Sequence, residues 1–260
     1  MNRGDLGPLG LLVEPGEPAP ELEELGYSTL WVRGGLLSSL DPLTDVLAAT
    51  RTARVGSAVA TLDANPAAAV AAVHRAAPDR FVPGVGGQGG LARIGGYLDE
   101  LDALGVPADA RLLAALGPRK LALARDRAAG ALTLLLTPAY AARARTALGP
   151  DAVLVVQHFV AIDPDRAAAR AALREPLRRL STLPGYAANL ARMGFTGGEV
   201  ADLADPLVDG VAAGGTVEAV AARLREYLDA GADHIAVAPL PTPAGPPDLA
   251  RLATAVRATG

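Results

Sequence analysis

The stretch LLAALGPRKLALARDRAAGALTLLLTP, residues 112–138, decides the fold. It begins with a short apolar run at 112–115 and ends with another at 132–136, and both have the length and character of buried strands. Between them the Gly-Pro pair at 117–118 opens a helical segment, because proline fixes φ at the value that a first helical turn requires. The stretch is therefore a strand, a helix and a strand, and this order favours parallel pairing.

The same alternation extends outward over the whole chain. Further helices are expected to begin at Asp41-Pro42, Asn65-Pro66, Thr137-Pro138 and Asp163-Pro164. The predicted strands cover residues 9–13, 29–32, 55–60, 81–85, 112–115, 132–136, 153–161 and 234–238. A doubly wound sheet uses the same alternation, but eight repeats without a dinucleotide-binding signature favour closure of the sheet. The chain is therefore predicted to be α/β, with a single (β/α)₈ TIM barrel covering residues 1–260 as one domain.

One connection is too long for a single crossover helix. More than 70 residues separate the seventh and eighth predicted strands, so a helical insertion is expected at about residues 173–213. Within it, Tyr186, Leu190, Met193 and Phe195 recur at near-helical spacing. This spacing predicts a helix that packs over the barrel or against a second subunit, rather than a cofactor-binding segment.

Composition excludes several functions. The formal net charge is −4 and the pI is near 5.4, so no basic field attracts nucleic acid or an anionic membrane. The chain has no cysteine, which excludes disulfides, thiolate metal ligands and cysteine nucleophiles. No metal site is expected because the three histidines fit no ligand spacing. The start of the chain lacks an apolar targeting segment, so a cytoplasmic protein is expected.

Several segments resemble, in the same order, the luciferase-like flavin and deazaflavin oxidoreductases, and most of all their small deazaflavin-dependent branch. The segments are 22–32, 65–86, 112–138, 157–173, 183–195 and 214–237. The resemblance implies a deazaflavin, coenzyme F420, or in second place FMN, at the C-terminal mouth of the barrel. It also implies hydride transfer to or from a small organic metabolite, and a homodimer.

The resemblance assigns cofactor contacts to three loops. Gly117, Pro118 and Arg119 stand where the fifth strand meets its helix, and a helix N-terminus offers free N–H groups to a phosphate. Thr61 and Leu62 stand where the family places a bulge or a cis peptide against the ring. Gly86 and Gly87, within the glycine-rich stretch 84–90, follow the fourth strand and allow close approach of a ligand. An ordinary turn and a flexible connector are the alternative interpretations of the first and last of these loops.

The sequence departs from the family pattern after the second strand. The resemblance implies a carboxylate there, whereas this chain has Arg33-Gly34-Gly35. Arg33 is therefore a candidate to bind an anionic substrate or the cofactor phosphate, or else a surface arginine. The glycine-rich loop also departs, with Gly87, Gln88 and Gly89 where the family often has a hydroxyl or an acid.

His158 and Asp63 are the candidates for proton transfer in place of the missing acid. Gln157 and His158 must point to opposite faces of their strand, and the alternation alone leaves open which one faces inward. Asp63 either faces the pocket or caps the following helix. His74 and His234 are expected to be structural.

Three functions remain open from the sequence. The first is an oxidoreductase that binds deazaflavin or FMN and a small-molecule substrate. The second is a divergent relative that has lost cofactor use and acts as a binding or scaffold subunit, and the third is a barrel recruited for non-redox catalysis.

Overall fold

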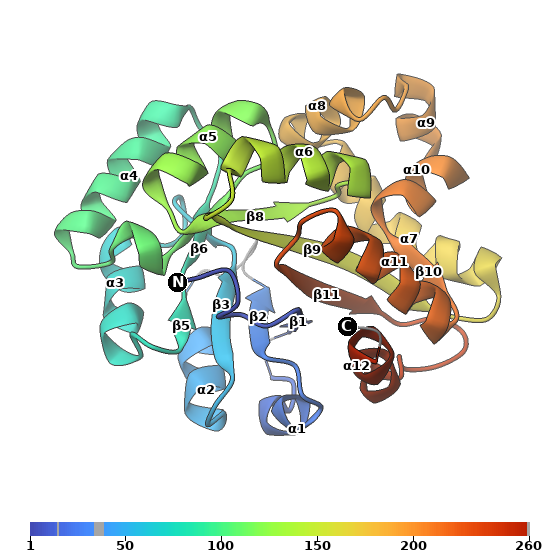
Figure 1. Ribbon diagram of the computed structural model, residues 1–260, viewed down its shortest axis with the longest axis horizontal. Coiled ribbons are helices and arrows are strands. Elements are labelled where there is room, and N and C mark those ends of the chain that lie inside the picture. Colours follow the sequence, from blue (N-terminus) through green and yellow to red (C-terminus); the bar gives the residue numbers. More distant parts are fainter. Residues whose placement is uncertain (15, 34–38, 259–260) are drawn as a thin grey trace.

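The computed structural model describes residues 1–14, 16–33 and 39–258, and within them parallel strands close into a barrel (Figure 1). Eight strand positions follow one another around the ring: β1 (Leu9–Val13), β2 (Thr29–Arg33), β3 (Arg54–Ala58) with β4 (Ala60–Thr61), β5 (Phe81–Val82) with β6 (Gly84–Gly86), β7 (Leu112–Ala114), β8 (Gly130–Leu134), β9 (Val153–Ile162) and β11 (His234–Leu240). The pairing of β11 with β1 closes the ring. The predicted (β/α)₈ barrel is confirmed.

Two strand positions are divided into halves. The peptide bond between Ala58 and Val59 is cis, and it separates β3 from β4. Pro83 separates β5 from β6, because proline has no N–H to donate to the ladder. The halves still pair with each other, β3 with β5 and β4 with β6, although the register shifts by one residue between the two pairs. Each divided segment therefore occupies one position in the ring.

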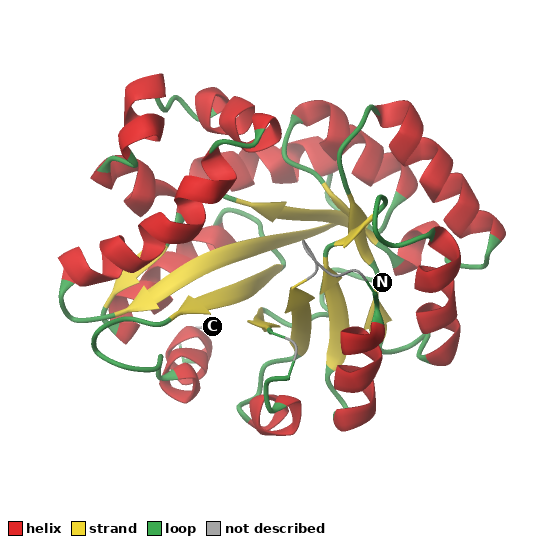
Figure 2. Cartoon of the chain, turned by 180° about the vertical axis from the view of Figure 1, so that it is seen from behind, coloured by secondary structure: helices red, strands yellow, loops and turns green. Residues whose placement is uncertain are grey.

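Helices surround the barrel on its outer side (Figures 1 and 2). They are α1 (Ala19–Glu24), α2 (Asp41–Ala49), α3 (Ala67–Ala76), α4 (Leu91–Ala103), α5 (Pro118–Arg127), α6 (Pro138–Leu148), α7 (Arg166–Ser181), α11 (Val217–Asp229) and α12 (Leu249–Arg257), with a short 3₁₀ turn η1 (Ala108–Ala110). The predicted starts at Pro42, Pro118 and Pro138 lie in the first turn of α2, α5 and α6.

The predicted insertion between β9 and β11 is present, but its start differs from the prediction. The extra elements are α8 (Pro184–Arg192), α9 (Gly197–Asp202), α10 (Asp205–Val211) and β10 (Ala213–Gly215). Residue 173, the predicted start, lies inside α7. This helix runs on through Pro176 because Leu173 and Leu177 bury one continuous apolar face. β10 pairs with β9 and was not predicted, since three small residues give no strand signal.

The barrel interior is filled by side chains, so a ligand of any size must bind at an end of the barrel. Leu12, Leu132 and Val155 belong to the interior cluster, whereas their neighbours Leu11, Ala131 and Val156 pack toward the helices. The alternation of each strand thus divides the core into an inner and an outer layer.

The interior also contains a hydrogen-bonded pair of polar side chains. Trp31 Nε1 donates to His234 Nε2 at 2.9 Å, and His234 Nδ1 lies 2.7 Å from the carbonyl oxygen of Gly7. Burial lowers the pKa of His234 to about 4. His234 therefore has a structural place inside the barrel, as the sequence suggested.

Candidate functional site at the barrel mouth

The carboxyl ends of the parallel strands meet at one end of the barrel, the mouth, which is where active sites of such barrels form. Arg33 ends β2, Thr61 ends β4, Gly86 ends β6, and Gly117 follows β7. The fold therefore brings most of the predicted cofactor- and substrate-binding residues to the same end.

Arg33 is held by a carboxylate that the sequence interpretation missed. Its Nε forms an ion pair with the carboxylate of Glu14, the first residue after β1. β1 and β2 are paired neighbours, and Val13 lies opposite Val32. The next residues along the chain, Glu14 and Arg33, therefore also lie opposite each other. The Arg33 side chain is 30% exposed and that of Glu14 is 55% exposed, so both are accessible to a ligand. Gly34 and Gly35 lie outside the described residues.

Glu14 brings a carboxylate to the end of β2, beside Arg33. The sequence search considered only residues that follow β2, whereas the acid follows the adjacent strand β1. The signal that could have found it is the position of Glu14 at a strand end beside Arg33, once β1 and β2 are taken as neighbours in the ring.

Thr61 and Leu62 form the rim between β4 and β6. The Leu62 N–H donates to the Gly86 carbonyl at 3.0 Å, and the Thr61 carbonyl accepts from the Asn65 N–H at 2.8 Å. The cis peptide that the resemblance implies near Thr61 and Leu62 is found earlier, between Ala58 and Val59. The predicted position was therefore wrong by a few residues, because the strand continues past the cis bond as β4.

Asp63 neither caps a helix nor stands free in the mouth. Its carboxylate pairs with Arg93 of α4 at 2.5 Å, and both side chains are about half exposed. α3 begins with no side-chain cap. Asp63 therefore does not cap α3. Its carboxylate lies beside the glycine-rich loop of the mouth, since Oδ2 is 3.7 Å from the position of a Cβ on Gly87, so Asp63 stays a candidate for proton transfer together with Glu14.

The packing of the protein itself leaves little room for a side chain at the glycines of the mouth. A Cβ on Gly86 would lie 2.5 Å from Ala114 Cβ on the neighbouring strand, and one on Gly87 would lie 3.0 Å from Leu62 Cδ1. The carbonyl of Gly87 accepts a hydrogen bond from Lys120 Nζ at 3.2 Å. Lys120 thus ties the start of α5 to the glycine-rich loop.

The start of α5 gathers positive charge. Gly117 precedes the helix, Pro118 opens it, and Arg119 and Lys120 occupy its first turn, which contains no acidic residue. Arg192 of α8 lies close by, since a Cβ on Gly117 would be 3.2 Å from its Nη1. Arg119, Lys120 and Arg192 form no ion pair with any described residue. Cations at the positive end of a helix repel it, so this edge of the mouth suits an anion.

The structure decides between Gln157 and His158. Val155 and Phe159 belong to the interior cluster, so Gln157, which lies between them, faces the interior, level with Leu134 of β8. His158 faces the helices, and its ring centre lies 4.5 Å from that of Tyr227 on α11.

The position of His158 does not support a role in proton transfer. The side chain is fully buried in the helical layer, and neither ring nitrogen has a hydrogen-bond partner among the described residues. Burial lowers the pKa of His158 to about 3, and the positive charge of Arg223 acts in the same direction. The imidazole is therefore neutral and away from the mouth, and we leave it out of the proposed site.

Helix α8 covers one side of the mouth. Gly185 lies over Leu116, and the Thr137 N–H donates to Met193 Sδ at 3.3 Å. Tyr186 and Leu190 pack on the interior cluster, and burial raises the pKa of Tyr186 to about 12. The predicted packing of this segment over the barrel is confirmed.

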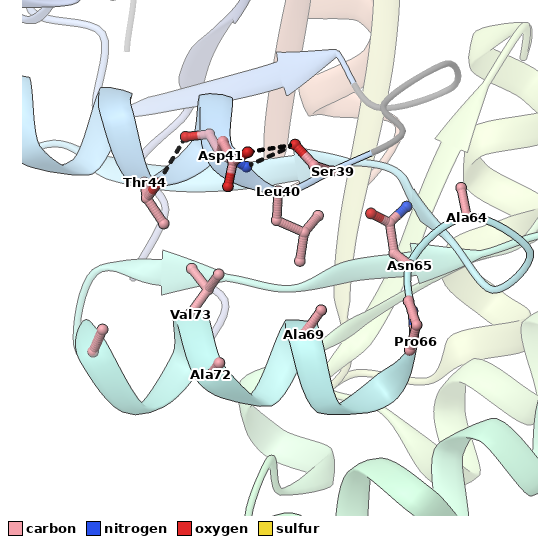
Figure 3. Close-up of a pocket in the computed structure, with 11 residues that line it drawn as sticks. Ser39, Leu40, Asp41, Thr44, Ala64, Asn65, Pro66, Ala69, Ala72 and Val73 are labelled. Carbon is pink, nitrogen blue, oxygen red and sulfur yellow. Dashed lines mark hydrogen bonds between the residues drawn. The ribbon is translucent and has the colours of Figure 1, made fainter.

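A separate hollow of about 460 Å³ lies between α2 and α3 (Figure 3). Its wall on α3 consists of small apolar residues, and its rim carries Ser39, which donates to Asp41 at 2.9 Å. The buried Asn65 lines it, and Oδ1 of this side chain has no partner among the described residues. Residues 34–38, which connect β2 to this rim, lie outside the described residues, so we assign the hollow no role.

Two general features complete the description of residues 1–14, 16–33 and 39–258. These residues contain no group of three or more side chains able to hold a metal ion. None of their helices is both long and apolar enough to cross a membrane.

No protein-family model matches the sequence, and no curated protein matches it. Solved structures do match the fold. An F420-dependent secondary alcohol dehydrogenase, in complex with an F420-acetone adduct, superposes with a TM-score of 0.70 at 14% identity over 96% of this chain and 99% of that chain. The coenzyme F420-dependent tetrahydromethanopterin reductase from Methanopyrus kandleri superposes with a TM-score of 0.71 at 16% identity, over 95% of this chain and 97% of that chain. Monooxygenase RslO1 from Streptomyces bottropensis superposes with a TM-score of 0.57 at 15% identity, over 96% of this chain and 96% of that chain. The chain therefore shares the fold of F420-dependent enzymes and monooxygenases, in agreement with the resemblance of its sequence.

Proposed function

We propose that the protein is an oxidoreductase that binds a deazaflavin, coenzyme F420, at the barrel mouth and transfers a hydride to or from a small organic molecule. One observation carries the proposal. The edge of the mouth at α5 holds Arg119 and Lys120 without an acidic partner among the described residues, beside a rim made by Leu62 and Gly87. The shared fold with F420-dependent enzymes supports the choice of cofactor.

The residues present fit such a cofactor. Phe159 and Ala238 of the interior cluster provide apolar surface below the mouth, which suits a flat ring. The backbone of Thr61, Leu62, Gly86 and Gly87 would form the rim beside the ring. Gly117, Pro118 and Arg119, with Lys120, would hold the phosphate, through backbone N–H groups and two cations. When bound, the deazaflavin supplies or accepts the hydride.

The chain itself contributes proton transfer, charge and shelter from water. Glu14 is an accessible carboxylate at the mouth, as is Asp63, so it is a candidate acid or base, and Arg33 positions it. Arg33 retains further N–H donors beyond its pairing with Glu14, and these suit a carboxylate or another oxygen-rich group of the substrate. α8 shields one side of the mouth, and this strengthens electrostatic interactions inside.

The test is a titration of the purified protein with F420 and, separately, with FMN, followed by ring fluorescence and by thermal unfolding. Saturable micromolar binding of F420 is expected, and at 100 times its Kd it should add about 2.7 kcal/mol to the free energy of unfolding. Preferential binding of FMN would replace the deazaflavin by a flavin, since a monooxygenase shares the fold. Binding of neither would overturn the proposal in favour of a non-redox or scaffold protein.

A further inference from the structure

Gln157 is a polar side chain inside the barrel. It lies on β9 between Val155 and Phe159, which belong to the interior cluster, and it is 7% exposed. Its neighbours on the two adjacent strands are Leu134 of β8 and Ala236 of β11, and both are apolar. The four positions around Gln157, two along its strand and two across, therefore offer its side chain no hydrogen bond.

The carboxamide of Gln157 is unpaired. Neither its oxygen nor its nitrogen has a hydrogen-bond partner among the residues that the structure describes. The unpaired polar atoms that are fully enclosed include those of His158 and Asn189 but not those of Gln157, so this carboxamide still reaches solvent. A polar group in an apolar interior is unfavourable unless a partner is supplied. The amide at this position therefore weakens the core and gains no hydrogen bond from the described protein.

Gln157 lies at the mouth end of the interior. Leu134, which pairs with it, is the last residue of β8 and is partly exposed, as is Ala114 at the end of β7. Phe159 follows Gln157 on the interior face toward the mouth, and it lies opposite Ala238 of β11. The carboxamide therefore lies at the edge of the apolar surface on which a flat ring is proposed to rest. An unpaired polar group at such a place conflicts with core packing, and such conflicts are typical of binding sites.

We propose that Gln157 binds the polar edge of the cofactor ring, where an N–H group stands between two carbonyl groups. This inference rests on the proposed function. A carboxamide has an acceptor and a donor side by side, and a carbonyl next to an N–H is the complementary pair. A carboxylate at this position would repel the carbonyl oxygens, and a cation could not accept from the N–H. Deazaflavin and flavin rings share this edge, so the inference holds for either cofactor.

The test is fluorescence titration of the whole protein with F420 and with F420 methylated at this ring N–H. Gln157→Met keeps the length of the side chain and removes its hydrogen bonds, so it should weaken F420 binding by about five- to thirtyfold, the effect of one or two hydrogen bonds. Methylation of the ring should weaken binding to the unmodified protein by a similar factor. In Gln157→Ala the methylated ring should bind within about twofold of F420, because the smaller side chain makes room for the methyl group and has no hydrogen bond to lose.

Two measurements separate ring binding from a structural role. Without F420, Gln157→Met should unfold at the same temperature as the unmodified protein or higher, because an unpaired amide leaves an apolar interior. With F420 bound, the infrared stretching frequency of a ring carbonyl should rise in this variant, because the carbonyl loses a hydrogen bond. Asn2→Met removes an exposed carboxamide near the start of the chain and should change none of these quantities.

The outcomes also separate this inference from the proposed function. Equal F420 affinity of Gln157→Met and the unmodified protein would overturn the inference, and so would an equal effect of ring methylation in the unmodified protein and in Gln157→Ala. A lower unfolding temperature of Gln157→Met without F420 would assign Gln157 to the fold instead. Binding of neither F420 nor FMN to the unmodified protein would overturn the proposed function itself. If FMN binds in preference to F420, the same comparison is made with FMN and its methylated form.

Discussion

At the scale of single residues, the surroundings of a side chain decide its chemistry more than its type does. His234 and His158 are both fully buried, but His234 has a partner at each ring nitrogen and His158 has none. Burial lowers the pKa of both. Glu14 and Asp63 are both exposed carboxylates at strand ends, and each pairs with an arginine, Glu14 with Arg33 of β2 and Asp63 with Arg93 of α4.

Replacing His158 should make the protein less sensitive to acid. The folded-state pKa of His158 is lowered from 6.5 to about 3, so the unfolded chain takes up a proton first as pH falls. The free energy of unfolding that the neutral, buried His158 contributes is therefore fully present above pH 6.5 and is lost as pH falls toward 3. Between pH 7 and pH 5, His158→Leu should lose about 2 kcal/mol less free energy of unfolding than the unmodified protein. Urea unfolding at both pH values checks this, and parallel losses would contradict it.

Glu14→Gln should impair turnover more than binding. Loss of a general acid or base typically costs about 10²- to 10⁴-fold in rate, so the rate of F420 reduction by a donor found in a substrate screen should fall in this range, with F420 affinity nearly unchanged. Glu24→Gln, an exposed change on α1, should leave the rate unaltered. Unchanged turnover in Glu14→Gln would remove Glu14 from the mechanism.

At the scale of elements, the charges in the first turn of α5 do not favour the stability of this helix. A helix with acids in its first turn gains from the macrodipole, whereas α5 has Arg119 and Lys120 there. α8 adds Arg192 to the same place instead of compensating it. Helix α8 of the insertion thus covers one side of the mouth and adds a positive charge to it.

Arg119→Gln/Lys120→Gln should move stability and affinity in opposite directions. F420 affinity should fall by about tenfold or more, because charge-assisted hydrogen bonds to the phosphate are lost. The free energy of unfolding should rise by about 0.5 kcal/mol or more, since repulsion at the helix start is relieved. Fluorescence titration and urea unfolding measure the two quantities. A fall in both would indicate that these cations support the fold instead.

At the scale of the whole molecule, the apolar surface of the insertion is used within the chain. Leu190 and Met193 join the buried clusters of the protein, and the partly buried Phe195 packs against Gly210 of α10 within the insertion. The large hydrophobic side chains exposed in the described part of the chain are Leu104 and Leu183. The insertion therefore does not offer the broad apolar patch on which a dimer was expected.

We nevertheless propose a homodimer, on the basis of the sequence resemblance, and expect it to use another surface. Sedimentation velocity at micromolar concentration should show a species of twice the chain mass of 26.3 kDa. A single species at the mass of one chain across that concentration range would refute the dimer.

The order of strands and helices was determined by the sequence alone, because apolar runs, helix-opening prolines and segment lengths are local properties. This order was enough to predict eight strand positions and the place of the insertion. Strand alternation also required Gln157 and His158 to face opposite ways. The loops at the mouth followed from the fold class, since parallel strands end together.

Only the tertiary structure decided the chemistry of the mouth. Glu14 meets Arg33 because the register of β1 and β2 aligns two strand ends, which no local pattern expresses. His158 faces α11 because the barrel curves with Gln157 inside, and Arg192 reaches Gly117 across more than 70 residues of chain. Side-chain partners depend on which segments the closed ring and the packed helices bring together, so the sequence determined the scaffold and the tertiary contacts determined the site.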